Sequence, residues 1–493
     1  MVRISPIAIC GGALFAAASV SAALDDFGVN QVHLAYGDAG DEMVVSWATP
    51  KALPEVPVVY FGVANSPTKT YSKVTGSSEH FKQLVNASSK LKIFCAHCVD
   101  EYFHRVTISG LSSGKKYGYF IEGEANATVR SFFAKNVSKL WAPTLAVFGD
   151  MGTEVGPMKT ISPSIKRLAD EANAGTIDAV LHVGDFAYDF WEQGGSKGDV
   201  FMNQIESIAS RVPYMTTLGN HEAGTNFVGD LHHYVKRFNM PGGTNGVYYS
   251  FDMGPAHIVS FSSEAYFWQL WEVEKQYEWL KKDLAAVDRS KTPWVITMAH
   301  RPMYCSNQDG DDCTKDDSNM RKGLPVLGMR FFALETLFQE HGVDLAFWAH
   351  EHSYERTWPV MDGKVLNGTS SPGAPYTNPR APVHIVAGAA GCREGHDEYN
   401  GPRGPWSAKR LSDFGYGRLR IENETHIHWE QIEDVDEKIV DAFWLIKDGK
   451  ANAKRQLEGS RDARATPEHQ KSVFERTKKC VSKLARLPGC GVY

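Results

Sequence analysis

The 493-residue sequence has little that would tie it to a membrane, to nucleic acid or to a fibre. Beyond its first 22 residues, no run reaches the roughly 18 apolar residues that a membrane-spanning helix needs. Cationic side chains are in the minority, 52 Lys and Arg against 58 Asp and Glu, which argues against electrostatic capture of nucleic acid. There is no internal repeat and no low-complexity tract. What remains, 43% hydrophobic and 22% charged residues, is typical of a globular chain of two or three domains.

Residues 1–22 are predicted to be an export signal. Arg3 supplies the charged start, Ile7 to Val20 an apolar and small-residue core, and Ala22 the end of a small-residue cleavage site. We therefore expect a secreted protein, or one of a lysosome-like lumen, without a membrane span. Asn-x-Ser/Thr sequons agree with this route and are candidate glycosylation sites: Asn86, Asn126, Asn136, Asn367 and Asn423.

Cysteines are few, and an odd number remains once Cys10 leaves with the signal. At least one thiol is therefore free or pairs with another chain. An oxidising compartment favours disulfides. Cys305 and Cys313 flank a polar loop and are the predicted bridge, while Cys480 and Cys490 are a candidate pair in the tail.

Two kinds of hydrophobic pattern divide the chain. In residues 24–137, short alternating strands between Gly, Pro and Ser turns predict an all-β domain. Its rhythm favours a fibronectin type III-like sandwich over a β-sandwich of another topology. Residues 139–380 alternate apolar strands with amphipathic helices, which predicts a layered α/β domain. Residues 381–440 return to strands and are expected to complete the same sheets, and residues 441–493 are predicted to be a charged, helix-prone tail.

Within the α/β region, each prediction has definite bounds. The strands are expected at 145–148, 179–183, 214–218, 258–261, 294–298 and 345–348. The helices are expected at 163–172, 271–287 and 328–341.

Five of these strands end in a turn that carries a metal-binding type of side chain. The candidate ligands are Asp150, Asp185, Tyr188, Asn220, His300, His350 and His352. Strands of an α/β sheet bring such turns to one edge, where ligands bind. Taken singly, an Asp after a Gly is usually only a turn residue. Together, the set supplies mixed oxygen and nitrogen ligands for two metals, and one shared Asp can bridge the pair.

The order of these motifs resembles the purple acid phosphatases within the calcineurin-like metallophosphoesterases. The motifs are Gly149-Asp150, Gly184-Asp185 with Tyr188, Gly219-Asn220-His221-Glu222, His300, and His350-Glu351-His352. Tyr188 matches the tyrosine of the purple type. The resemblance implies helices packed on two mixed β-sheets behind an all-β N-terminal domain, small phosphorylated substrates, and a homodimer as in many large relatives.

The resemblance also implies a role for each ligand. Fe(III) would be held by the group Asp150, Asp185, Tyr188 and His352. A divalent ion (Zn, Fe or Mn) would be held by the group Asp185, Asn220, His300 and His350. His221 would lie beside the phosphate as electrostatic clamp and proton donor. The sequence departs from the family in two places, Ala349 where many relatives have Gly, and Arg301 where histidines often follow the fourth motif.

The sequence supports two interpretations of Arg301 equally. Its guanidinium can hold a phosphate through paired donors, so it joins Asn220 as a candidate substrate-binding residue. It can equally form a structural salt bridge. 

The predicted activity is that of a metal-dependent acid phosphatase, in which metal-bound hydroxide attacks a phosphate monoester. An alternative enzyme would use the same site on phosphodiesters or nucleotide pyrophosphates. A binding protein with an inactive site is a weaker alternative because all the ligands are present. Cys95 and Cys98 form a CxxC pair, but no second pair completes a zinc site and no thioredoxin pattern surrounds them.

Overall fold

The computed structural model describes residues 27–448, except 84, 87–92, 95–97, 126–127, 155–160, 224–229, 269, 308–311, 327 and 400–401. The predicted signal, Cys95, Asn126, Cys480, Cys490 and the tail from residue 449 lie outside the described residues, as does the side chain of Asn86.

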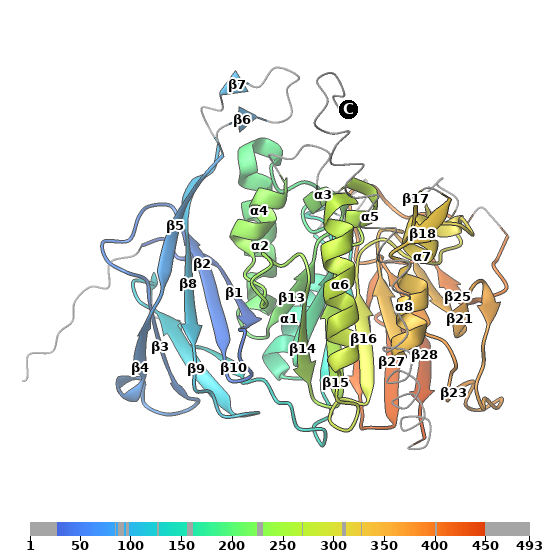
Figure 1. Cartoon of the computed structure of the whole chain (residues 1–493). Coiled ribbons are helices and arrows are strands. Elements are labelled where there is room, and N and C mark those ends of the chain that lie inside the picture. Colours follow the sequence, from blue (N-terminus) through green and yellow to red (C-terminus); the bar gives the residue numbers. More distant parts are fainter. Residues whose placement is uncertain are drawn as a thin grey trace, which may run out of the picture.

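The N-terminal region consists of two four-stranded antiparallel sheets, as the all-β prediction required (Figure 1). One sheet has the order β1 (Asn30–Tyr36), β2 (Met43–Thr49), β8 (Asp100–Ile108), β5 (Ser77–Lys82). The other has the order β10 (Arg130–Phe133), β9 (Lys116–Ile121), β3 (Val58–Val63), β4 (Ser72–Thr75). Short elements complete this region: η1 (Thr68–Thr70), β6 (Val85–Asn86) and β7 (Ile93–Phe94).

Two seven-stranded mixed sheets form the second region. The first has the order β13 (Tyr214–Thr217), β12 (Ala179–Val183), β11 (Thr144–Phe148), β26 (Gly415–Ile421), β27 (His426–Glu433), β28 (Ile439–Ile446), β23 (Tyr376–Thr377). The second has the order β14 (Tyr249–Met253), β15 (Ala256–Ser260), β16 (Trp294–Met298), β19 (Leu345–Trp348), β24 (Val383–Ala387), β20 (Tyr354–Thr357), β25 (Ser407–Leu411). Strands β24 to β28 therefore complete the sheets that the earlier strands begin, as expected.

Helices lie against these sheets, and two small hairpins occur between the larger elements (Figure 1). The helices are α1 (Pro163–Ala174), η4 (Glu192–Gly195), α2 (Ser196–Ala209), α3 (Asn220–Ala223), α4 (Asp230–Arg237), α5 (Ala265–Trp268), α6 (Leu270–Ala286), η5 (Asp312–Thr314), α7 (Asn319–Lys322) and α8 (Leu334–His341). The hairpin strands are β17 (Leu324–Val326), β18 (Met329–Phe331), β21 (Val360–Met361) and β22 (Lys364–Val365). Within the described residues, no helix is long and apolar enough to cross a membrane.

Two predicted elements were wrong in part. The helix expected from residue 328 begins only at Leu334, because β18 pairs with β17 in the preceding hairpin. The helix-prone tail was expected from about residue 441, but β28 continues to Ile446. Phe443 and Leu445 on β28 are buried while Trp444 is exposed, so the segment alternates as a strand does.

The central strands are hydrophobic throughout, which is why their positions could be predicted. β11 is buried except at its first residue, and β12, β16 and β19 are buried at every residue, as expected for strands covered on both faces. One continuous core joins the N-terminal sheets to the two seven-stranded sheets, and it includes Leu34 of β1 and Met215 of β13. The turns that follow the central strands are therefore held by a rigid base.

Candidate dinuclear metal site

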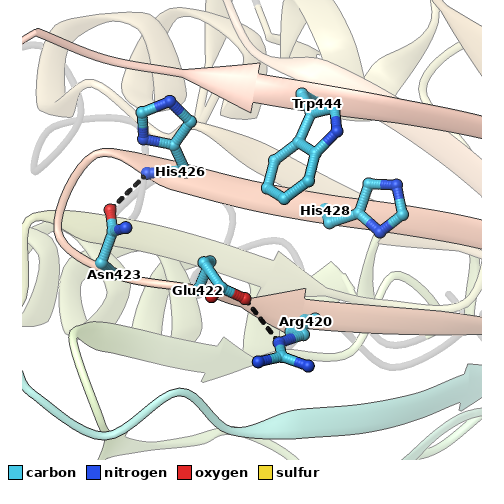
Figure 2. A pocket seen from close by; sticks show the side chains of 6 residues that line it. All are labelled: Arg420, Glu422, Asn423, His426, His428 and Trp444. Atoms are coloured by element: carbon cyan, nitrogen blue, oxygen red, sulfur yellow. Dashed lines mark hydrogen bonds and ion pairs between the residues drawn. The ribbon is translucent and has the colours of Figure 1, made fainter.

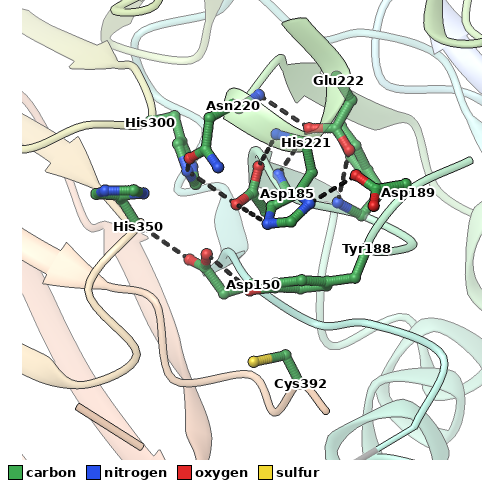
Figure 3. A network of polar contacts seen from close by, with 12 residues as sticks. Asp150, Asp185, Tyr188, Asp189, Asn220, His221, Glu222, His300, His350 and Cys392 are labelled. Atoms are coloured by element: carbon green, nitrogen blue, oxygen red, sulfur yellow. Dashed lines mark hydrogen bonds and ion pairs between the residues drawn. The ribbon is translucent and has the colours of Figure 1, made fainter. Parts of the chain in front are cut away.

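The predicted ligands follow the carboxyl ends of central strands in both large sheets. They are Asp150 after β11, Asp185 and Tyr188 after β12, Asn220 after β13, His300 after β16, and His350 and His352 after β19. Within each sheet these strands run parallel, so their carboxyl ends share an edge. Figure 3 shows the side chains of the two edges facing one another.

Tyr188 is the centre of a first group of three. Its hydroxyl lies 3.0 Å from Asp150 Oδ1 and 2.8 Å from His352 Nε2. His352 Nε2 is also 3.6 Å from Asp150 Oδ1. All three side chains are nearly or fully buried. This is the set that the resemblance assigns to iron, apart from the shared Asp185.

Asp185 is the centre of the second group. Its Oδ2 lies 3.2 Å from His300 Nε2, which in turn lies 3.0 Å from Asn220 Oδ1. One ligand atom each of Asp185, His300 and His350 can be chosen so that all lie within 4.8 Å of one another. The backbone N–H of His350 donates to Asp150 Oδ2 over 2.9 Å, which links the second group to the first.

Four of the predicted ligands have left-handed backbone conformations. The φ angles are 58° at Asp150, 53° at Asp185, 49° at Tyr188 and 73° at His350. Such conformations are uncommon for residues other than glycine and tend to cluster at functional sites. Gly219 allows the close approach, because a Cβ there would lie 2.1 Å from Asp185 Oδ1. The turns are built to aim side chains inward.

The buried carboxylates of the site raise the pKa of two of the histidines. Burial lowers the pKa of His352, but Asp150 and Cys392 raise it to about 12. Burial likewise lowers the pKa of His300, and Asp185 and Asp150 raise it to about 9. The buried carboxylates are thus balanced by protonated imidazoles. A metal would displace those protons, because a ligating histidine must be neutral.

The residues present fit two metal ions. Ligand nitrogen and oxygen atoms lie roughly 2.0–2.2 Å from such ions, so neighbouring ligands at a right angle are about 3 Å apart. The separations around Tyr188 and around His300 are 2.8–3.2 Å. Carboxylate, phenol, amide and imidazole are also the donor types that iron and zinc accept.

His221 lies beside the candidate metal site. Its Nδ1 contacts Asp189 Oδ1 at 2.7 Å, and its Nε2 is 3.9 Å from Asp185 Oδ2. Burial lowers its pKa, but Asp185 and then Asp189 raise it to about 10. Sequence reasoning missed Asp189, although its place directly after Tyr188 was the available signal.

Glu222 ties two of the turns together. Its carboxylate accepts hydrogen bonds from the backbone N–H groups of Asp185, Phe186 and Gly219, at 2.8, 2.9 and 2.9 Å. Because these groups belong to the turns after β12 and β13, Glu222 fixes their relative position (Figure 3).

Arg301 forms the salt bridge that one interpretation predicted. Its Nε lies 3.0 and 3.1 Å from the oxygens of Glu264, whose side chain is fully buried. Its Nη1 lies 2.7 Å from His350 Nε2, and its guanidinium stacks 4.5 Å from the ring of Phe267. A role in substrate binding stays a prediction for Arg301, as it does for Asn220.

The described cysteines occur in two forms, disulfide-bonded and free. Cys305 and Cys313 form a disulfide, as predicted, with their Cα atoms 5.4 Å apart. Cys98 is also disulfide-bonded. Cys392 is a buried free thiol, which agrees with the odd count, and its Sγ lies 3.3 Å from His352 Nδ1. No sequence pattern pointed to this contact.

Among the sequons, the described side chains are at Asn136, which is half-buried, and at Asn367 and Asn423, which are exposed. Modification at each stays a prediction.

The fold and the site define a calcineurin-like metallophosphoesterase. Residues 143–354 match the family described as calcineurin-like phosphoesterase. Residues 29–135 match the purple acid phosphatase N-terminal domain, and residues 381–442 match the iron/zinc purple acid phosphatase-like protein C.

Similar proteins narrow the class. Acid phosphatase type 7 of Danio rerio is 44% identical over 428 residues, covering 85% of this chain and 91% of that protein. Purple acid phosphatase 18 of Arabidopsis thaliana is 30% identical and covers 84% of both chains. The solved structure of purple acid phosphatase PPD1 from yellow lupin (Lupinus luteus) seeds is 25% identical, with a TM-score of 0.71 over 87% of this chain and 76% of that one. The chain belongs to the purple acid phosphatases and is a metal-dependent acid phosphatase.

Proposed function

We propose that the chain is a secreted enzyme that hydrolyses small phosphate monoesters at an Fe(III)–divalent metal pair, by direct attack of water on phosphorus. Asp150, Tyr188 and His352 would hold the iron, Asn220, His300 and His350 the divalent ion, and Asp185 both. One observation carries this proposal: the phenol oxygen of Tyr188 lies within 3.0 Å of both Asp150 and His352. A buried phenol among such partners is suited to a trivalent ion.

The metal pair, when bound, supplies positive charge toward the phosphate and acidifies the attacking water. Proton transfer and its orientation depend on side chains of the protein. Asp189 holds His221 Nδ1 at 2.7 Å, which leaves Nε2 to carry a proton toward the leaving alcohol. The two carboxylates beside His221 keep it protonated at acid pH, and metal charge on Asp185 would bring its pKa down from about 10.

Metal content and colour test the iron assignment. Elemental analysis of the purified protein is expected to find two metal ions per chain. The visible absorption band of an Fe(III)–tyrosinate pair is expected in the wild type and should be lost in Tyr188→Phe. A coloured Tyr188→Phe protein would mean that Tyr188 is not the iron ligand.

Turnover of His221→Ala tests the proton donor. We expect kcat to fall by about 10²–10⁴-fold, the usual contribution of general acid catalysis, with both metals retained. Unchanged turnover across the pH range would exclude this role.

Substrate choice separates the monoesterase from the diesterase. The names of the relatives support a monoesterase, because they are acid phosphatases. Rates on an aryl phosphate monoester should exceed those on the matching diester. The reverse ratio would favour the phosphodiesterase, and no activity with both metals bound would favour a binding protein. Recovery of the enzyme from the culture medium would test export.

A further inference from the structure

An open hollow lies on the outer surface of the first seven-stranded sheet, the one that contains β26, β27 and β28, far from the metal site. It has a volume of about 470 Å³, and its lining consists of Arg420, Glu422, Asn423, His426, His428 and Trp444 (Figure 2). The turn that borders it joins β26 to β27 beside the amino end of β11, since Ile421 N–H donates to Pro143 O over 2.9 Å. Asp150 follows the opposite end of β11. The hollow is therefore separate from the catalytic machinery.

Asn423 is held at the rim in a fixed orientation. Its Oδ1 accepts hydrogen bonds from Thr425 N, Thr425 Oγ1 and His426 N, at 2.8, 2.9 and 3.0 Å. Its backbone carbonyl accepts from Trp294 Nε1 at 2.8 Å. With the carbonyl side of the amide bound, the exposed Nδ2 is left on the side of the hollow (Figure 2).

Trp444 forms the apolar wall of the hollow. It is 42% exposed, whereas other tryptophans such as Trp294, Trp348 and Trp429 are buried. Trp444 is the cross-strand neighbour of His428, and their rings stack at 4.4 Å and 29°. Arg420 is the partner of His428 on the other side. One row across three strands thus offers an indole face beside charged and hydrogen-bonding groups.

We propose that Asn423 carries an N-linked glycan whose first sugars are seated in this hollow against Trp444. Asn423-Glu424-Thr425 is a sequon in an exposed turn, which is where such modification occurs. The Nδ2–C1 bond forms as the C1–O bond to a lipid diphosphate donor breaks, and Nδ2 gives up one proton.

The hollow suits the face of a sugar ring. The C–H face of a pyranose is apolar and packs on an indole, while its hydroxyls and acetamide can hydrogen-bond to Arg420, Glu422 and His428. A volume of about 470 Å³ lies within the roughly 300–1,000 Å³ of small-ligand pockets. Because the sugar is tethered at the rim, it reaches the hollow at a high effective concentration. The inference rests on the proposed export of the chain but not on its chemistry.

Mass spectrometry of glycopeptides tests the modification. The full chain is produced with its own leader in a glycosylating eukaryotic cell line. We expect glycan on most copies of Asn423, also in the Thr425→Ser variant, which keeps the sequon. An unmodified Asn423 overturns the proposal. If Asn367 in the same sample carries a glycan, the chain has been exported, and the failure belongs to Asn423 alone.

A double-mutant cycle tests whether the first sugars pack against Trp444. Trp444→Ala is expected to lower the Tm of the glycosylated protein by about 2–4 °C and to have little effect in the Asn423→Gln background. Trp444→Phe should restore part of the loss. An endoglycosidase that leaves one N-acetylglucosamine should preserve the Tm. Phosphatase activity should stay unchanged in every variant.

Two outcomes would contradict the packing of the glycan against Trp444. An equal Tm loss from Trp444→Ala in both backgrounds would mean that Trp444 packs against something other than the glycan. A change of oligomeric state in Trp444→Ala, with Asn423 unmodified, would assign this face to a second copy of the chain.

Discussion

At the scale of single residues, Asp189 is the side chain that orients His221. Its Oδ1 lies 2.7 Å from His221 Nδ1, and its Oδ2 lies 3.9 Å from Arg393 Nη2. On the proposed proton-donor role of His221, Asp189→Asn should lower kcat by about 10–100-fold, the usual cost of removing an orienting partner, with KM little changed. Steady-state kinetics measure this split. The visible spectrum and Tm should match those of the wild type, and a raised KM with an unchanged kcat would contradict the positioning role.

Cys392 gives a second prediction at this scale, which rests on the proposed iron site. Its thiol sulfur lies 3.3 Å from Nδ1 of His352, whose Nε2 contacts the Tyr188 hydroxyl at 2.8 Å. A sulfur that accepts from Nδ1–H makes His352 a stronger donor to the iron, which raises the energy of the tyrosinate charge-transfer band. Cys392→Ala should therefore shift the visible band to longer wavelength, while Cys392→Ser, which keeps an acceptor, should shift it less. Identical spectra of all three proteins would contradict the contact.

The sequence indicated the residues that meet at the candidate metal site better than it indicated the residues around them. Asp150, Asp185 and Asn220 follow glycines at the ends of apolar strands, and both signals are local. The only local signal for Asp189 is its place after Tyr188, and its contact with His221 depends on the convergence of two turns. Cys392 is 40 residues from His352 along the chain, and local pattern contains no information on that contact because it depends on tertiary packing.

At the scale of elements, His257 joins a strand to a helix by its charge. It lies on β15, with Nδ1 2.7 Å from Asp252 on β14 and Nε2 3.0 Å from Asp283 on α6. Burial lowers its pKa, but the two carboxylates raise it to about 9. A histidine with a raised pKa stabilises the fold fully below its unfolded value, about 6.5, and this contribution is lost as pH rises through 9.

His257→Gln should therefore destabilise the protein most at acid pH, by roughly 1–3 kcal/mol, and least near pH 10. Thermal unfolding across this pH range measures the difference. His104→Gln is a suitable control, because burial lowers the pKa of His104 to about 4 and its pH dependence has the opposite sign. A deficit for His257→Gln that does not depend on pH would mean that the imidazole is neutral.

Elements could be predicted where burial covers both faces. β11, β12, β16 and β19 begin and end within a residue of their predicted bounds, because their apolar runs are unbroken. β28 was missed because only Phe443 and Leu445 of its eight residues are buried, and β4 because it is exposed at most positions. Edge and surface strands depend on their partners more than on their own hydrophobicity.

At the scale of the whole molecule, Arg237 connects the N-terminal sheets to the catalytic region. Its side chain is fully buried on α4, 2.7 Å from Asp199 on α2 and 3.5 Å from Glu101 on β8. Its Nη1 also donates to Gln31 on β1 over 2.8 Å. Arg237→Ala would leave the Asp199 carboxylate without this cation and the Gln31 side-chain oxygen without its donor, so we expect about 3–5 kcal/mol of destabilisation by calorimetry. A loss below 1 kcal/mol would contradict the role of Arg237 as the link.

Glu101 makes that connection depend on pH. Burial and then Asp199 raise its pKa to about 8, against the opposing effect of Arg237. The folded chain therefore keeps a proton on Glu101 that the unfolded chain loses above about 4.3, so stability falls as pH rises from 4.3 to 8. Glutamine has the shape of protonated glutamate and has no such penalty. Glu101→Gln should have a Tm equal to the wild type at pH 4 and a higher Tm, by a few degrees, at pH 7.5.

A matched variant on the same region sharpens this test. Glu124 is also buried, and both of its oxygens accept hydrogen bonds from Arg130 at 2.7 Å. Glu124→Gln should lower the Tm at pH 7.5, where Glu101→Gln raises it. If Glu101→Gln also lowers the Tm at pH 7.5, Glu101 is ionised beside Arg237, and the link between the two regions is an ordinary salt bridge. The opposite signs would show that this interface favours acid conditions, which is the environment in which an acid phosphatase works.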